Sequence, residues 1–341
     1  MIKGSKVLRG AARYIPAGPL RPFGRPVALF FHGVAECFHD PRIEVNHHSA
    51  EAFCRIAMQL KRDFRVMPLA SLDDALRNPA KHARSVFLMS DDGYANTLLA
   101  ADILGELALP WSLFVSTEHI DTGAFNPLIL ARLFVHFAAD GEYRLPHLAR
   151  EVFLRNADDR ARTAKWLLAG LKRLPICKAR AAIRAMSDAF PAARLESLRN
   201  TFASERYLTW AEVETLHRRN VEIGAHAHWH WPMNACQSEE ELLLQATLPR
   251  EAIAAHTGRC DYFSYPFGNE GDVSSRARQA VRAAGYSHAF STLSGTLRPD
   301  CDPWLLPRYG LRAEEPNLGA LVPLLRLGNP RVARFSQKLA A

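Results

Sequence analysis

The sequence of 341 residues predicts an α/β domain in which helices cover a parallel sheet. Short apolar runs rich in strand-forming residues alternate with segments that carry helix-start signals, before residue 125 and again after residue 206. Two of these runs end in clusters of carboxylates or histidines, as expected at the carboxyl ends of parallel strands. The alternation fits a closed barrel and also a doubly wound open sheet.

Four strands are expected in the first part of the chain, at residues 27–31, 65–69, 86–89 and 111–116. Ser49 is a suitable N-cap for a helix that runs to about residue 64. Ser71 and Asp74 are three residues apart and resemble a capping box at the start of another helix. The third strand leads through Asp91 into a further expected helix.

Four more strands are expected late in the chain, at residues 221–224, 262–267, 286–291 and 306–311. Capping-box patterns at Thr209–Glu212 and Ser238–Glu241 predict the starts of two helices. Pro249 is expected to kink or interrupt the second one, because it lacks an N–H and its ring clashes with the preceding turn. A third helix is expected at residues 274–284, closed by Gly285.

Between about Phe125 and Arg206 the alternation breaks. This stretch is rich in Ala, Leu and Arg, has helical periodicity and contains few strand candidates. We interpret residues 125–206 as a helical insertion on one α/β domain of residues 25–315. A basic extension, residues 1–24, precedes this domain, and residues 316–341 form a tail.

The net charge of +8 and the pI near 9.3 favour an anionic partner or surface. Nucleic acid is not the expected partner, because the sequence has no dense Lys/Arg run and no DNA- or RNA-binding motif. The basic ends, residues 1–24 and 321–339, suit peripheral contact with an anionic membrane, although a solvated basic surface is the plainer alternative. No apolar stretch reaches the roughly 18 residues of a membrane span, and no secretory signal is evident, so we expect a cytoplasmic protein.

The strongest local signal is Asp91-Asp92-Gly93, directly after an apolar run. Two adjacent carboxylates at a strand end cannot both be buried cheaply unless a cation or basic group compensates them. Acidic capping residues at a helix start are the alternative interpretation.

The second signal is a set of three histidines in five residues, His226, His228 and His230, after another expected strand. Histidines at i and i+4 meet on one side of a helical turn, a spacing that suits one metal ion, and His228 should then point elsewhere. Pro232 disfavours continuing the helix, which places this turn in a loop between strand and helix. A structural histidine is the usual interpretation of one such residue, but three together favour metal binding.

The two signals together predict a catalytic metal site. Asp92, His226 and His230 would leave coordination positions for water and substrate, and this donor set favours Zn over Co, Ni or Mn. In such a site bound water becomes acidic and a carbonyl is polarised, while Asp91 accepts the proton of the water. This chemistry hydrolyses an amide or ester without a protein nucleophile.

These motifs resemble those of the polysaccharide deacetylases of carbohydrate esterase family 4, the NodB-homology group. Asp91–Gly93 matches the D-D-G motif, His226–His230 matches H-(S/T)-x-x-H, and Phe263–Gly268 matches the later substrate-groove motif. Weaker matches cover the start and the end of the domain, at Phe30–Val34, Gly285-Tyr286 and Leu306–Arg308. The resemblance spans about residues 25–315.

The resemblance implies a distorted (β/α) barrel, usually of seven strands, with Asp91 as the base and Asp92, His226 and His230 as metal ligands. It implies that the backbone N–H of Phe267 binds the oxyanion. The rest of the implied substrate groove consists of Tyr265, Pro266 and Gly268. Trp229 and Trp231, which flank His230, are candidates for stacking on a sugar ring, with core packing as the alternative for each.

The sequence departs from the family pattern at two positions. Many members carry Arg in the third motif, where this chain has Ser264, and many end with a Leu-x-His motif that is absent here. We therefore expect Arg308 to orient Asp91, and His32 or His288 to protonate the leaving amine. For His288, a partly buried strand histidine is the alternative.

The predicted function is removal of N-acetyl groups from aminosugars of a surface glycan or its lipid-linked precursor. A deformylase or O-deacetylase of similar mechanism is one alternative, because the shape of the pocket selects the acyl group. An inactive glycan-binding relative is another. The sequence indicates neither the glycan nor the oligomeric state.

Overall fold

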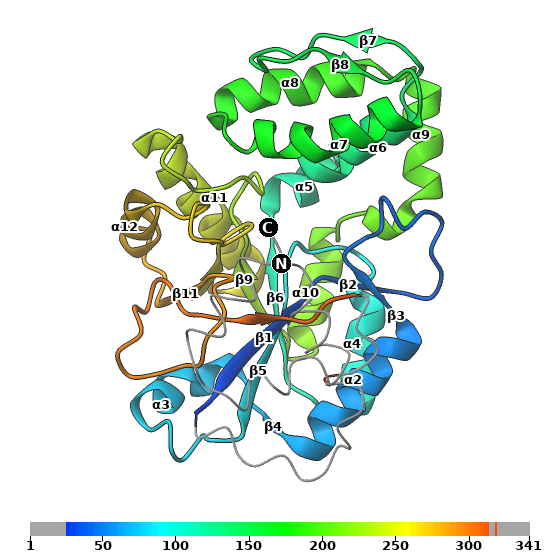
Figure 1. The fold of residues 1–341 in the computed structure, drawn as a ribbon. Helices are drawn as coiled ribbons and strands as arrows, with labels where there is room; N and C mark the ends of the chain where they lie inside the picture. The colour runs from blue at the N-terminus through cyan, green and yellow to red at the C-terminus, as the bar shows by residue number, and fades with distance from the viewer. Residues whose placement is uncertain (1–24, 314–317, 319–341) are drawn as a thin grey trace, which may run out of the picture.

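A computed structural model describes residues 25–313 and Leu318. Seven parallel strands pair in the order β11-β10-β9-β6-β5-β1-β12 (Figure 1). Their bounds are β1 Val27–Phe31, β5 Ser85–Ser90, β6 Ser112–Val115, β9 Glu222–Ala225, β10 Tyr262–Ser264, β11 His288–Phe290 and β12 Tyr309–Gly310. A parallel bridge between Phe290 and Leu306 joins β11 to the segment before β12, which closes the sheet. The distorted barrel is therefore confirmed, and the open doubly wound sheet is not formed.

Helices surround this barrel, and short strands complete it. The helices are α2 Ala50–Asp63, α3 Leu72–Arg77, α4 Thr97–Glu106, α5 Thr117–Thr122, α10 Trp210–Arg218, α11 Glu239–Thr257 and α12 Ser275–Ala283. A short strand, β4 Arg65–Val66, pairs with the start of β5. Two further strands, β2 Gly33–Ala35 and β3 His47–Ser49, form a separate parallel pair.

The strands are apolar on both faces because each face meets a different core. In β5, Phe87 and Met89 point into the barrel interior, whereas Val86 and Leu88 pack against the outer helices. The interior is narrow enough to require glycine at Gly224, where a Cβ atom would lie 2.6 Å from the ring of Phe114. Successive side chains of a strand point to opposite faces, so this alternation also sets which side chains just after a strand point into the barrel interior.

Most of the predicted helix starts are confirmed. Ser49 accepts the Ala52 N–H, and both capping boxes, Thr209–Glu212 and Ser238–Glu241, are formed. The box predicted at Ser71 is wrong. A 3-10 turn, η1 Leu69–Ser71, leads directly into α3, so Ser71 lacks the extended backbone of an N-cap.

Two other predictions differ from the structure. Pro249 does not interrupt helix α11, which runs from Glu239 to Thr257. The Pro249 side chain is buried. Strand β10 ends at Ser264 and not at residue 267, because Phe267 and Gly268 adopt left-handed backbone angles, each with φ of 63°. This early turn brings the groove motif back over the end of the barrel.

The chain between β6 and β9 contains a layer of helices that lies beyond one end of the barrel (Figure 1). Its elements are α6 Pro127–Phe137, α7 Ala157–Leu171, α8 Ile176–Asp188, α9 Ala192–Thr201, the 3-10 turn η2 Ala203–Glu205 and a hairpin of β7 Glu142–Tyr143 with β8 Val152–Phe153. The sequence did not predict this hairpin. The layer has its own apolar core, which also takes in Trp231. None of the helices in residues 25–313 is long and apolar enough to cross a bilayer.

Candidate metal and catalytic site

The end of β5 sends two adjacent carboxylates in different directions. Asp91 continues the alternation of Phe87 and Met89 and enters the barrel interior, whereas Asp92 has a left-handed φ of 79°. Gly93 follows with φ of 92°, and a Cβ atom there would lie 3.0 Å from the Val115 side chain. The Asp-Asp-Gly sequence thus forms a turn that directs Asp92 toward the loop after β9.

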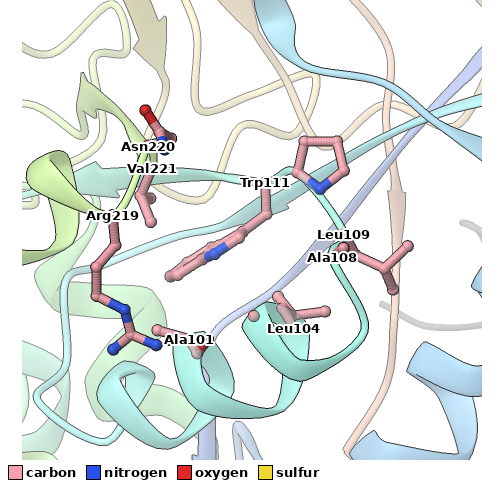
Figure 2. A pocket seen from close by; sticks show the side chains of 10 residues that line it. Ala101, Leu104, Ala108, Leu109, Trp111, Arg219, Asn220 and Val221 are labelled. Carbon is pink, nitrogen blue, oxygen red and sulfur yellow. Dashed lines mark hydrogen bonds between the residues drawn. The ribbon is translucent and has the colours of Figure 1, made fainter.

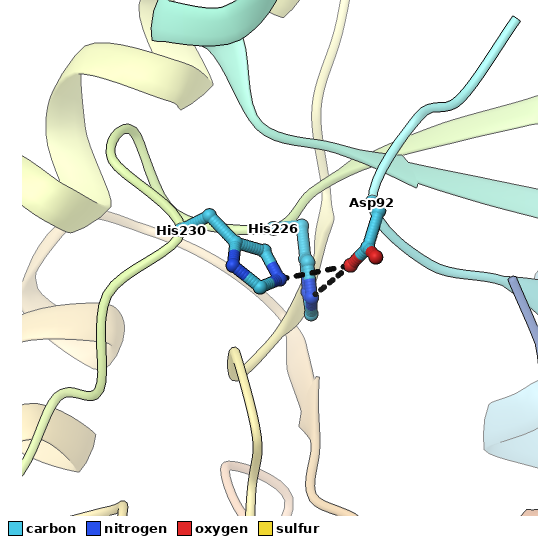
Figure 3. Close-up of side chains that lie close together, drawn as sticks. All are labelled: Asp92, His226 and His230. Carbon is cyan, nitrogen blue, oxygen red and sulfur yellow. Dashed lines mark hydrogen bonds and ion pairs between the residues drawn. The ribbon is translucent and has the colours of Figure 1, made fainter. Parts of the chain in front are cut away.

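In that loop two histidines converge on Asp92 (Figure 3). The Oδ1 atom of Asp92 lies 3.2 Å from Nε2 of His226 and 2.9 Å from Nε2 of His230. The three side chains are buried, and their ligand atoms lie within 4.8 Å of one another. Two imidazole nitrogens and one carboxylate oxygen suit zinc or another first-row divalent metal, so this donor set fits the ion that the resemblance implies.

The histidine loop is not the helical turn that the i, i+4 spacing predicted. Ala227 and His230 both have left-handed backbone angles, with φ of 58° and 48°. These two bends, and not a helical repeat, bring His226 and His230 together. As predicted, His228 points elsewhere, since its Nδ1 lies 2.7 Å from the Thr117 hydroxyl.

Each metal-facing imidazole has a second partner on its Nδ1 atom. The Nδ1 of His226 lies 2.8 Å from the Ser264 carbonyl oxygen, so it donates its proton there and leaves Nε2 free for a metal. The Nδ1 of His230 lies 3.0 Å from the side-chain amide nitrogen of Asn126. Asn126 was not predicted from the sequence, where its only signal is an Asn-Pro pair typical of a helix start.

Asn126 has two roles at once. Its Oδ1 atom accepts the Leu128 N–H and caps helix α6 of the insertion. The amide nitrogen therefore faces the site, where it donates to the Tyr207 hydroxyl at 3.0 Å and contacts His230. The helical insertion is thus connected directly to a metal-ligand candidate.

The Asp91 carboxylate is paired with the guanidinium of Arg308. Arg308 donates two hydrogen bonds to the two oxygens of Asp91, of 2.9 and 2.7 Å, and a third of 2.7 Å to the Ser264 hydroxyl. The guanidinium is completely buried in the barrel interior, 4.4 Å from the centre of the Phe30 ring. Ser264, at the position where many relatives carry Arg, leaves room for this side chain.

The two aspartates have lowered pKa values for different reasons. Burial alone would raise the pKa of Asp91, but the charge and hydrogen bonds of Arg308, together with the charges of His226 and His32, outweigh it and keep the pKa below the ordinary 3.8. Burial also opposes ionisation of Asp92, where His230 and His226 hold the pKa well below that value. Both groups are therefore carboxylates at neutral pH.

The turn after β10 lies beside the metal-ligand candidates. The Phe267 ring meets the His230 ring edge-on, with 5.3 Å between centroids. The turn requires Gly268, since a Cβ atom there would lie 2.7 Å from the Thr292 nitrogen. Thr292 also donates a 2.6 Å hydrogen bond to the Phe267 carbonyl, which fixes the strained backbone. Pro266 is buried within the same turn.

Two aromatic residues of the predicted groove are not available to substrate. Tyr265 is completely buried, and its hydroxyl donates to the Trp304 carbonyl in the outer core. Trp231 is completely buried in the core of the insertion and donates to the Leu174 carbonyl. The structure therefore packs both rings into apolar cores and away from the metal-ligand candidates. Trp229 remains partly exposed, with the Arg180 guanidinium 4.9 Å above its ring.

The two candidate proton donors lie in different places. His32 follows β1 at the same end of the barrel as the two aspartates, and the negative charges of both aspartates favour its protonated form. Burial lowers the pKa of His32, and the charges of Asp92 and Asp91 partly oppose this. His288 begins β11, two residues before the end where Ser264 meets Asp91, and its Nε2 pairs with Asp73. The structure therefore does not bring His288 to the site.

A surface hollow lies at the opposite end of the strands, where β6 and β9 begin (Figure 2). It is lined by Trp111, Arg219 and residues at the end of α4. Trp111 directly precedes β6, so it lies at the end of the strands away from Asp91 and Asp92. The hollow contains none of the predicted catalytic or metal-binding residues.

Comparison with known proteins agrees with this geometry. The family model for polysaccharide deacetylases matches residues 78–289, more than half of the chain. No curated protein sequence matches the chain.

Solved structures share the fold at low identity. The deacetylase PplD from Streptococcus pyogenes, in complex with acetate, has a TM-score of 0.55 and 12% identity, over 86% of this chain and 95% of that one. A polysaccharide deacetylase from Bacillus cereus has a TM-score of 0.55 and 13% identity, over 88% and 69% of the two chains. IcaB from Ammonifex degensii has a TM-score of 0.54 and 13% identity, over 89% and 97%.

Proposed function

Because this chain belongs to the polysaccharide deacetylase family, we propose that it is a metal-dependent hydrolase of N-acetyl groups on the aminosugars of a surface polysaccharide or its precursor. One observation carries the proposal. A buried Asp92–His226–His230 set lies directly beside a second buried carboxylate, Asp91, which has its own cation. This arrangement separates the metal ligands from the base, as amide hydrolysis by activated water requires.

Asp92, His226 and His230 would hold the divalent metal, for which zinc is our first expectation and Co, Ni or Mn the alternatives. When bound, the metal supplies Lewis acidity to the acyl carbonyl and to the attacking water. Asp91 accepts a proton from that water as its oxygen bonds to the carbonyl carbon. Arg308 fixes the plane of the Asp91 carboxylate and keeps it ionised for this role.

The backbone N–H of Phe267 donates to the oxyanion that forms on the former carbonyl oxygen. Collapse of the tetrahedral intermediate then breaks the C–N bond and releases acetate. His32 donates a proton to the departing amine, and its position supports this role because it follows β1 directly, where the Asp91 N–H donates to the Phe31 carbonyl. Trp229 is the remaining candidate for stacking on the sugar ring.

The direct test is acetate release from N-acetylglucosamine oligomers by metal-loaded protein and by its Asp91→Asn variant. We expect the variant to keep its metal and to lose acetate release. Formate release from formylated sugars, or acetate release from O-acetyl esters alone, would support the deformylase or O-deacetylase alternative. Glycan binding with no product, at full metal content, would identify an inactive relative.

His32 and His288 provide a matched pair for the proton donor. We expect His32→Gln to slow acetate release and His288→Gln to leave it near the wild-type rate, since His288 lies outside the site. The reverse result, with metal content unchanged in both, would remove His32 from the mechanism.

The predicted partner is a glycan or a lipid-linked glycan. A cytoplasmic location with peripheral membrane contact stays a prediction, because the basic ends that suggested it, residues 1–24 and 321–339, lie outside the described residues.

A further inference from the structure

Within residues 25–313, the positive charge is concentrated in the helical insertion. Residues 125–206 contain 15 Lys and Arg against 8 Asp and Glu, an excess of seven. Residues 25–124 and 207–313, which form the barrel and its helices, contain 19 basic and 25 acidic residues, a net charge of −6. The insertion is therefore a basic layer on an acidic barrel.

One basic segment of the insertion is attached to the loop that carries the metal ligands. This segment, residues 172–180, runs from the end of α7 into α8 and contains no acidic residue. Its four cations are Lys172, Arg173, Lys178 and Arg180. We call these four residues the cationic rim.

The attachment uses three side chains of the histidine loop and its continuation. The Trp231 indole donates to the Leu174 carbonyl at 3.2 Å, and the Asn234 amide donates to the Lys172 carbonyl at 3.0 Å. Gln237 accepts the N–H at the start of α8 at 2.9 Å. The backbone of the rim is therefore fixed relative to His226 and His230.

Two cations of the rim lie on aromatic rings of the candidate groove. The Lys172 ammonium is 3.9 Å from the centre of the Phe267 ring, which itself touches His230. The Arg180 guanidinium lies 4.9 Å above Trp229. One aromatic ring thus separates the Lys172 charge from a metal-ligand candidate.

Neighbouring carboxylates balance only two of the four charges of the rim. Lys172 pairs with Asp272, and Arg180 pairs with Glu118. Arg173 and Lys178 are exposed, and neither has an ion pair among residues 25–313. Two unpaired positive charges therefore lie on the segment whose other two cations, Lys172 and Arg180, contact Phe267 and Trp229.

We propose that the cationic rim binds an anionic group of the substrate, so that the enzyme prefers aminosugar glycans bearing a carboxylate or a phosphate near the N-acetyl group. This inference rests on the proposed function only in treating the groove at Phe267 and Trp229 as the sugar site. A uronate in the glycan and the diphosphate of a lipid-linked precursor offer the same chemistry to the rim. Exposed charges of this kind favour one ligand over another and act more weakly as salt rises.

The test is equilibrium binding to metal-loaded protein of three ligands with the same aminosugar. They are a neutral N-acetylglucosamine oligomer, the same oligomer oxidised to uronate at C6, and an N-acetylglucosamine diphosphate carrying a short prenyl chain. We expect at least one charged ligand to bind about fivefold tighter than the neutral one at low salt. The advantage should shrink at high salt, and the ligand that shows it identifies the source of the charge.

The variant Arg173→Gln/Lys178→Gln should remove this advantage without changing the affinity for the neutral oligomer. Its control, Lys165→Gln/Arg194→Gln, removes the same charge from exposed positions of α7 and α9 and should keep it. Equal affinities for all three ligands, or equal losses in both variants, would overturn the proposal. Binding needs no turnover, so a protein that prefers charged ligands yet releases no acetate would refute the proposed function and leave the rim standing.

Discussion

Asp91 and Asp92 are neighbours in the chain and equally buried, each 2% exposed, yet their surroundings differ. Asp91 lies against the guanidinium of Arg308, so this half of the site already balances its charge. Asp92 lies between His226 and His230, which bind metals in their neutral form and leave the carboxylate charge to be balanced by a cation. The charge of Asp91 is thus balanced within the chain. The charge of Asp92, on what we call the metal side of the site, is left for a bound metal ion to balance.

The largest expected effect concerns activity. Asp91→Asn should reduce acetate release about 10³-fold while metal content stays at the wild-type level, because it removes the proton acceptor and no metal ligand. Asp92→Asn should lose both metal and activity. Acetate assays with elemental analysis of the same samples test this, and loss of metal from Asp91→Asn would show that the two halves are one site.

The next effect concerns stability in metal-free protein. Arg308→Met should lower the free energy of unfolding by about 3 kcal/mol, because it leaves the buried Asp91 carboxylate without its cation. Asp92→Asn should change it by less than about 1 kcal/mol, since the side-chain amide can donate to the Nε2 atoms of the two histidines. Urea unfolding measures both. Adding Asp91→Asn to Arg308→Met should recover part of the loss, and no recovery would mean that Arg308 acts through packing alone.

The pH dependence of the same pair has a definite sign. Arg308 lowers the folded-state pKa of Asp91, so the pair stabilises the fold fully above the ordinary value of 3.8 and loses this stabilisation as pH falls further. In Arg308→Met, burial should instead raise the pKa of Asp91. The stability gap between wild type and variant should therefore be small at pH 3 and widen by pH 6. A constant gap in urea unfolding series would contradict this account.

The sequence predicted the parts of this comparison that depend on local patterns. Alternating strands and helices, and the N-caps at Ser49, Thr209 and Ser238, follow from short-range hydrogen bonds and periodicity. The barrel itself came from the family resemblance. Arg308 was expected beside Asp91 because this chain has Ser264 in place of the usual arginine, and Arg308 does donate to both Asp91 and Ser264.

Features that depend on three-dimensional placement could not be predicted in this way. Tyr265 and Trp231 belong to matched or flanking positions of the motifs, but the packing of two different cores turns their rings away from the groove. His288 and His32 were both candidates for the proton donor. The strand register pairs His288 with Tyr262, two residues before Ser264, which lies at the site. Asn126 is 104 residues from His230, and nothing local marks it as a partner.

The smallest effect that we predict tests how the insertion tunes the metal side. Binding through Nε2 puts the proton of neutral His230 on Nδ1, which then needs an acceptor, yet Asn126 faces it with an amide N–H. Asn126→Asp would supply a carboxylate that accepts from Nδ1 and still caps Leu128. The Tyr207 hydroxyl, which accepts from Asn126, would then donate to this carboxylate. We therefore expect it to tighten metal affinity by up to about tenfold, whereas Asn126→Leu should weaken it by about as much.

A matched control exists at the N-cap of α7, where Asn156 caps the Asp159 N–H without approaching the metal side. Asn156→Asp adds the same charge to the same insertion and should leave metal affinity unchanged, because exposed charge at that distance is screened. Competition titrations with a chelator measure all three variants. Equal tightening by both aspartates would show that net charge, and not the contact with His230, sets the affinity. Tightening confined to Asn126→Asp would instead show that the insertion reaches the metal through one hydrogen bond.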